Sequence, residues 1–238
     1  MDGKEKSTGK KKRIVVEPDG PYRVEGGIPL VNKVQVVSEY GEPLTWKTLN
    51  RIETGEEYSL CRCGHSSDFP FCDCTHAEIG FDGTETARTD TFEERKRDLP
   101  GGQGLVVKLD NYLCMGSGFC GNRLTNIRKM MSHTAEPSVR AEIIAMIERC
   151  PAGAYTYAMQ EGEADIEPDL PEQIAVTVDI TSDGPIRSAY WVTGNIPIER
   201  ADGQPFEIRN RVTLCACGES RNKPLCDGRH RNLKSTRK

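Results

Sequence analysis

The chain has 238 residues, including ten cysteines and four histidines, and carries a formal net charge of −4. A chain of this length forms one large domain or two to three small ones, and its balanced charge excludes a global basic field for nucleic-acid binding. Aromatic residues make up only 6% of the chain, and no apolar run approaches the roughly 18 residues that a membrane span needs.

The first predicted element is a disordered basic tail over residues 1–18. Its opening stretch, MDGKEKSTGKKKRI, lacks the apolar core of a signal peptide, and Asp2 and Glu5 are atypical of a mitochondrial presequence. A basic docking arm is the alternative interpretation. Without an export signal, the cysteines are expected in the cytoplasm, where clustered thiols bind metal or do redox chemistry instead of forming disulfides.

Residues 19–98 are predicted to form a first small module. It opens with DGPYRVEGGIPL, and the runs KVQVV and YSLC predict short strands separated by Gly and Pro turns. The stretch CRCGHSSDFPFCDCTH follows, from Cys61 to His76. We expect a mostly antiparallel β unit that ends in this Cys-rich stretch.

A middle segment over residues 104–160 follows a predicted linker, LPGGQG, at residues 99–104. The run LVVKL predicts a strand, and EPSVRAEIIAMIERC predicts a helix with Pro137 in its first turn. The helical period places a set of mainly apolar residues near one face: Val139, Ile143, Met146, Ile147 and Cys150. The segment is therefore predicted to be a compact α+β unit.

A second module is predicted over residues 174–238, after an acidic linker at residues 161–173. DGPIRSAYWVTGNIPI repeats the opening of the first module, and CACGESRNKPLCDGRH repeats its Cys-rich stretch. Each module has too few apolar residues for a large core, so a bound metal centre is expected to help hold it together. The predicted fold class is mostly β with an α+β insert.

The repeated stretch has the form C-x-C-x8-C-x3-H. The candidate ligands are Cys61, Cys63, Cys72 and His76 in one copy and Cys215, Cys217, Cys226 and His230 in the other. A helical turn would bring the third Cys and the His to one face, and Asp73 and Asp227 are expected to cap that turn. The C-x-C pair favours two thiolates on one iron of a two-iron cluster. A tetrahedral zinc site and cysteines that bind no metal are the alternatives.

Both stretches resemble the CDGSH (mitoNEET-like) iron–sulfur family, whose pattern is C-x-C-x2-(S/T)-x3-P-x-C-D-G-(S/T/A)-H. The second copy departs from that pattern at Arg229, and the first at Cys74, where the family has Gly. The resemblance implies a 2Fe–2S cluster in each copy, with two Cys on one iron and Cys plus His on the other. It also implies that the two modules pair as an intramolecular pseudo-dimer. Cys74 is interpreted as a tolerated small residue, an extra thiol near the cluster or a regulatory cysteine.

Three cysteines of the middle segment remain: Cys114, Cys120 and Cys150, the last followed by Pro. CMGSGFC with a distant Cys-Pro resembles a divergent monocluster ferredoxin, with Ser117 where such proteins have their second Cys. The resemblance implies a third cluster. Three thiolates suit a 3Fe–4S cluster, and a 4Fe–4S cluster would need water, Ser117 or another oxygen as fourth ligand. The remaining interpretation is an empty site with packing cysteines.

These features predict a multi-cluster electron-transfer protein that works with redox partner proteins. The alternative is a carrier that passes a labile cluster to an apo-acceptor, or a redox or pH sensor, because each outer site has a single His ligand. A zinc-stabilised interaction module is the third interpretation. The sequence has no nucleophile–base pair, P-loop or dinucleotide fingerprint, so no catalytic residues are assigned and a stand-alone enzyme is not expected.

Overall fold

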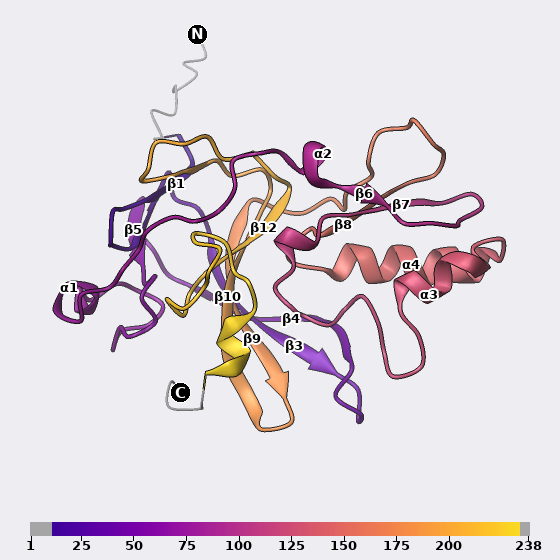
Figure 1. Cartoon of the computed structure of the whole chain (residues 1–238). Helices are drawn as coiled ribbons and strands as arrows, with labels where there is room; N and C mark the ends of the chain where they lie inside the picture. The colour runs from indigo at the N-terminus through magenta and orange to yellow at the C-terminus, as the bar shows by residue number, and fades with distance from the viewer. Residues whose placement is uncertain (1–10, 234–238) are drawn as a thin grey trace, which may run out of the picture.

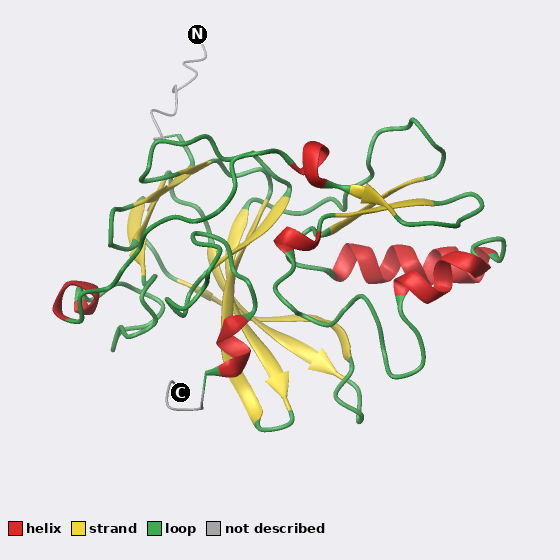
Figure 2. Ribbon diagram, viewed as in Figure 1, coloured by secondary structure: helices red, strands yellow, loops and turns green. Residues whose placement is uncertain are grey.

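The computed structural model describes residues 11–233 (Figure 1). Short strands dominate, long loops join them, and the helices gather mainly in the middle of the sequence (Figure 2). The expected fold class, mostly β with an α+β insert, is confirmed. Within the described residues, no helix combines the length and the apolar character that crossing a bilayer requires.

The first sheet has the strand order β11-β1-β2-β5. Its strands are β1 (Arg13–Val16), β2 (Tyr22–Glu25), β5 (Glu57–Leu60) and β11 (Ile198–Glu199). The prediction of a disordered tail over residues 1–18 is wrong for β1, because Ile14 and Val16 are buried in the core. The rest of that prediction lies partly in residues 1–10, outside the described residues.

The second sheet has the order β12-β10-β9-β3-β4. Its strands are β3 (Leu30–Val37), β4 (Pro43–Ile52), β9 (Gln173–Thr181), β10 (Gly184–Thr193) and β12 (Arg211–Leu214). The runs of β-branched residues thus form strands, as the sequence predicts.

The two modules exchange strands. β3 leaves the first module and pairs in parallel with β9 of the second, with Leu30 opposite Ile174. β11 leaves the second module and pairs in parallel with β1, with Ile198 opposite Ile14. The modules therefore pair within one chain, and their mostly antiparallel sheets each include one parallel pairing from the other module.

The middle segment forms a three-stranded sheet with helices on one side (Figure 1). The strands are β6 (Arg97–Asp98), β7 (Val106–Leu109) and β8 (Tyr155–Ala158). The helices are η1 (Asn111–Leu113), α3 (Ile127–Met130), η2 (Met131–His133) and α4 (Pro137–Arg149), and α2 (Phe92–Arg95) precedes them. The predicted strand and helix are both present, and Ile143, Met146 and Ile147 are buried on the expected helix face.

The two predicted linkers are instead ordered connections. Leu99 is buried and its N–H donates to the carbonyl of Val107, so LPGGQG is the loop of the β6–β7 hairpin. In the acidic stretch, Asp165 forms ion pairs with Lys96 and Lys108, and Glu167 pairs with Arg211. Charge pairing, which the local sequence does not reveal, holds this segment against the protein.

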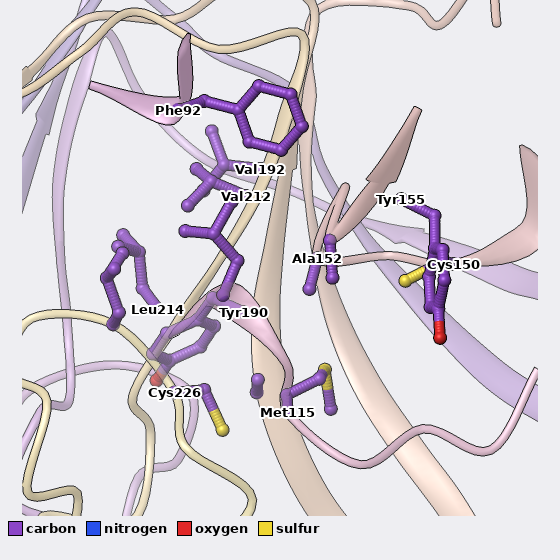
Figure 3. Packing of buried hydrophobic residues seen from close by; sticks show 14 of the residues in the cluster. Phe92, Met115, Cys150, Ala152, Tyr155, Tyr190, Val192, Val212, Leu214 and Cys226 are labelled. Carbon is purple, nitrogen blue, oxygen red and sulfur yellow. The ribbon is translucent and has the colours of Figure 1, made fainter. Parts of the chain in front are cut away.

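One apolar core extends through both modules and the middle segment. Figure 3 shows Tyr190 and Leu214 within it with Cys226 beside them, whereas Cys150 and Tyr155 mark the side formed by the middle segment. The expectation that each module has only a small core of its own therefore needs correction, because strand exchange merges the separate apolar faces into one larger core.

Candidate iron–sulfur sites

Each Cys-rich stretch begins where a strand ends and finishes in a helical turn: α1 (Thr75–Glu78) in the first module and η3 (Arg229–Asn232) in the second. The same backbone bonds close both loops. Cys61 donates to the Pro70 carbonyl at 2.8 Å, and Cys215 donates to that of Pro224 at 2.9 Å. The Ser hydroxyls within the loops donate to the carbonyls of Phe71 and Leu225, each at 2.6 Å. The repeated sequence thus folds into the same loop twice.

The four donors of each module stand as two pairs. In the first module the Sγ atoms of Cys61 and Cys63 lie 3.7 Å apart, and Cys72 Sγ lies 3.3 Å from His76 Nδ1. The corresponding separations in the second module are 3.7 and 3.4 Å. Two thiolates at about 2.3 Å from one tetrahedral metal lie about 3.8 Å apart, and a thiolate–imidazole pair lies about 3.5 Å apart. Each pair therefore has the spacing of two ligands on one tetrahedral metal ion.

Among residues 11–233, no three His, Cys, Asp or Glu side chains surround a point that one metal ion could fill. The structure thus brings the predicted donors of each module together in twos. The turn that was expected to align Cys with His is present in both copies, because Cys72 meets His76 and Cys226 meets His230.

Backbone amides and burial shape the chemistry of the thiols. The N–H of Gly64 points at Cys61 Sγ at 3.3 Å, and that of Gly228 points at Cys226 Sγ at 3.4 Å. Burial raises the pKa of the Cys63 thiol to about 11, and it raises that of Cys226 well above its usual value. These thiols resist ionisation unless a cation compensates the charge, so metal binding and thiolate formation are coupled.

Asp73 and Asp227 bind the helical turn but are not the N-caps that the sequence predicts, because Cys74 and Gly228 occupy those positions and neither makes a side-chain cap hydrogen bond. Asp73 accepts a hydrogen bond from the amide of Thr75 at 3.0 Å and one from the amide of Ser67 at 2.8 Å. Hydrogen bonds from these two residues lower the pKa of the Asp73 carboxyl. Asp227 accepts from the amides of Arg229 and Arg221 in the same way. Each carboxylate links the long loop to the start of the helical turn that carries the His.

Two tyrosines join the modules and were missed by the sequence analysis. The Tyr22 hydroxyl lies 2.9 Å from the Cys215 carbonyl, and the Tyr190 hydroxyl lies 2.8 Å from the Cys61 carbonyl. Each tyrosine is fully buried and donates a hydrogen bond to the ligand loop of the other module. Their equivalent positions in the two openings, DGPYRV and RSAYWV, were the available signal.

The two departures from the family pattern have structural explanations. Cys74 adopts the left-handed conformation, with φ of 69°, that Gly228 adopts in the second copy. A Cβ at Gly228 would lie 2.6 Å from the carbonyl oxygen of Met115, so only Gly fits there. Cys74 is exposed, and a side chain is therefore tolerated at that position. Arg229 pairs with Asp227 at 3.1 Å.

The three middle cysteines lie close enough to affect one another. Cys114 lies at the surface, Cys120 is half-buried and Cys150 is buried. Desolvation and the nearby Cys150 raise the pKa values of both Cys114 and Cys120, and Cys114 adds to the effect on Cys120. Ser117, the candidate oxygen ligand, is buried, and its carbonyl accepts a hydrogen bond from Gln35 at 2.8 Å. The three thiols thus influence one another electrostatically, although among residues 11–233 no three such side chains surround a point that a single metal ion could fill.

Arg211 connects this site to the second module. Its side chain is fully buried and donates from Nη1 to the carbonyls of Ile147, Glu148 and Cys150 at 2.8 to 3.0 Å, at the carboxyl end of α4. A cation is favoured there because the helix end exposes unpaired carbonyls. Sequence reasoning missed Arg211, whose partners lie far away in the chain.

Arg211→Met is expected to lower the free energy of unfolding by about 2 to 3 kcal/mol, because it leaves these buried carbonyls and Glu167 without their donor. Denaturant unfolding followed by circular dichroism measures the loss. Arg51→Met, at an exposed position of β4, is the control. Equal losses in the two variants would contradict this assignment.

A β-rich fold that brings soft thiol and imidazole donors together in pairs defines a protein with candidate metal-binding sites. Residues 19–77 and 187–231 match the family described as iron-binding zinc finger of CDGSH type, and residues 101–160 match the family described as divergent 4Fe-4S mono-cluster. The chain thus has two segments similar to the CDGSH family that flank a segment similar to the divergent monocluster family. The search of curated proteins found no match.

Proposed function

We propose that the protein transfers electrons and holds three clusters: a 2Fe–2S cluster in each CDGSH module and a third cluster in the middle segment. The observation that carries this proposal is the arrangement of donors in pairs, with 3.7 Å between thiols and 3.3 to 3.4 Å between thiol and imidazole, in both modules. Such pairs suit the two irons of one cluster.

The residues fit the implied clusters. Cys61 and Cys63 would hold one iron of the first cluster, with Cys72 and His76 on the other; Cys215 and Cys217, then Cys226 and His230, would do so in the second. Bound clusters supply one-electron redox chemistry. The chain contributes the amide donors at Cys61 and Cys226 and a buried setting, both of which tune reduction potential.

The middle site would take its third cluster from Cys114, Cys120 and Cys150. Three thiols support a 3Fe–4S cluster, whereas a 4Fe–4S cluster would recruit an oxygen from water, Ser117 or another group. The matched family is described by a 4Fe–4S cluster, which supports the second form. We propose redox partner proteins in a reducing compartment such as the cytoplasm, since all ten cysteines are free thiols.

Iron analysis with visible and EPR spectra of anaerobically purified protein tests the proposal. About four irons per chain are expected from the outer modules, and about seven or eight when the middle site is filled. About two zincs per chain with no visible absorbance would contradict the proposed function.

Cluster transfer is a second candidate function, and the partial exposure of His76 favours it. A carrier would pass its cluster to an apo-acceptor, whereas an electron carrier would be reduced and reoxidised without losing it. Mixing the reconstituted protein with an apo-ferredoxin, and following both proteins by circular dichroism in the visible range, separates the two functions.

A further inference from the structure

The two candidate His ligands have different surroundings. His230 is 4% exposed, and its Nδ1 lies 3.4 Å from Cys226 Sγ. Its other ring nitrogen, Nε2, lies 3.2 Å from Asp179 Oδ2 and 3.1 Å from the Ser188 hydroxyl. The His230 ring is therefore held from both sides inside the protein.

Asp179 is a buried acceptor from β9. Its side chain is fully buried, and Arg231 donates to the same Oδ2 atom at 2.8 Å. A carboxylate beside Nε2 favours the tautomer in which Nε2 carries the hydrogen and Nδ1 keeps its lone pair. Second-shell carboxylates of this kind orient a metal-binding imidazole and raise its basicity. Asp179 thus prepares Nδ1 to act as a ligand.

This contact exists because the second module has a longer hairpin. Val16 faces Tyr22 across β1 and β2, with residues 17–21 between them. The equivalent pair, Val176 and Tyr190, is separated by residues 177–189, which extend the β9–β10 hairpin. Figure 1 shows this hairpin beside the helical turn near the C-terminus that carries His230. The extension supplies both Asp179 and Ser188.

The short turn of the first module leaves His76 open. His76 is partly exposed and lines a surface pocket of about 630 Å³ with Pro18, Asp19 and Phe81. Among the residues that the structure describes, His76 Nε2 has no hydrogen-bond partner, and only the contact of Nδ1 with Cys72 is present. Solvent or an acceptor can therefore reach this ligand from outside.

We propose that Asp179 and Ser188 are positioning residues that make the second module the cluster-retaining site, and that the first module is the site that exchanges its cluster. The inference rests on the proposed function, because it requires both modules to hold clusters. The two copies of the motif would then have different functions. The β9–β10 hairpin would hold His230 in place, and the partly exposed His76 would be accessible to an acceptor protein.

Cluster loss to excess EDTA at constant neutral pH tests this division. The reconstituted full chain is expected to lose its outer clusters in two phases, and Cys72→Ser should remove the fast phase while Cys226→Ser removes the slow one. Asp179→Ala is expected to accelerate the slow phase about 10- to 100-fold, the range typical for loss of a second-shell partner. An apo-ferredoxin offered in place of EDTA should receive its cluster from the first module.

Two milder variants separate positioning from folding. Asp179→Asn keeps an acceptor near Nε2 but removes its charge, so it should raise the reduction potential of the second cluster and leave the first unchanged. Ser188→Ala should accelerate the slow phase less than Asp179→Ala. Asp183→Asn, at an exposed position of the same hairpin, removes an equal charge and should change neither rate nor potential.

Specific results would overturn the inference. Equal loss rates from the two modules would do so, as would an unchanged slow phase in Asp179→Ala or an equal effect of Asp183→Asn. These outcomes concern protein that contains clusters. A protein that binds zinc or no metal would instead contradict the proposed function itself.

Discussion

Replacing Gly218 by alanine is expected to destabilise the folded protein by about 3 to 5 kcal/mol. Gly218 has φ of +81°, a conformation that costs energy for any residue with a Cβ. A Cβ added there would also overlap the carbonyl oxygen of Cys63 in the other module. Because a backbone carbonyl cannot move aside as a flexible side chain can, the clash separates the two ligand loops.

The reciprocal variant, Gly64→Ala, should have a similar effect. Gly64 has φ of +79°, and its added Cβ would lie 2.6 Å from the carbonyl oxygen of Cys217. Gly203→Ala is the matched control, since Gly203 has φ of +71° but no atom within 4 Å of the added Cβ. This control should be destabilised only by the cost of placing a Cβ at positive φ, which is about 1 kcal/mol in the free energy of unfolding.

Denaturant unfolding followed by far-UV circular dichroism measures all three variants. If Gly64→Ala and Gly218→Ala lose no more stability than Gly203→Ala, the two ligand loops are not in backbone contact. The expected result would show that the modules fold as one unit, with each Cys-x-Cys loop resting on the other.

Local sequence was sufficient to predict the ligand loops and the elements around them. The Cys and His offsets place donors within a single turn, and Asp73 and Asp227 act on amides two residues away. The helix at Pro137–Arg149 followed from its apolar period and its first-turn proline. These features depend on neighbours in the chain, which a sequence displays directly.

Pairing between distant strands was not predictable in the same way. Ile14 pairs with Ile198 and Leu30 with Ile174, and nothing near any of these residues specifies its partner. The same limitation caused 161–173 to be interpreted as a linker, since the cations that pair with its acidic groups lie elsewhere in the chain. The resemblance of the repeated stretches implied that the modules pair but identified no strand partners, and the equivalent tyrosines of the two openings were a further signal for this contact.

Asp179 shows which part of the site could not be predicted from local sequence. It lies in the run AVTVDI, which belongs to β9. An acidic residue among β-branched ones suggests an unusual environment, but its partner His230 is 51 residues away. The hairpin length that brings the two together becomes meaningful only when the strand pairing of both modules is known.

Cys120→Ala is expected to abolish the EPR signal of the third cluster and to lower the iron content by about three or four per chain. The middle site offers only three thiols, so losing one leaves too few ligands for a cluster. The Cys120 carbonyl, which accepts a hydrogen bond from Ile127 at 3.0 Å, is retained in the variant. The local fold should therefore survive, and the absorbance of the two outer clusters should remain.

Cys74→Ala provides the matched control for that experiment. Cys74 is an exposed cysteine that belongs to none of the paired or clustered donor sets, so its removal should leave iron content and all spectra unchanged. Unaltered spectra and iron content in Cys120→Ala would show that the middle cysteines hold no cluster. If Cys120→Ala instead lost outer-cluster absorbance and kept the third signal, the assignment of Cys120 to the middle site would be wrong. The expected pattern is that one signal disappears and two persist. It follows because Cys114, Cys120 and Cys150 are separate in the sequence from both CDGSH loops and influence one another electrostatically in the fold.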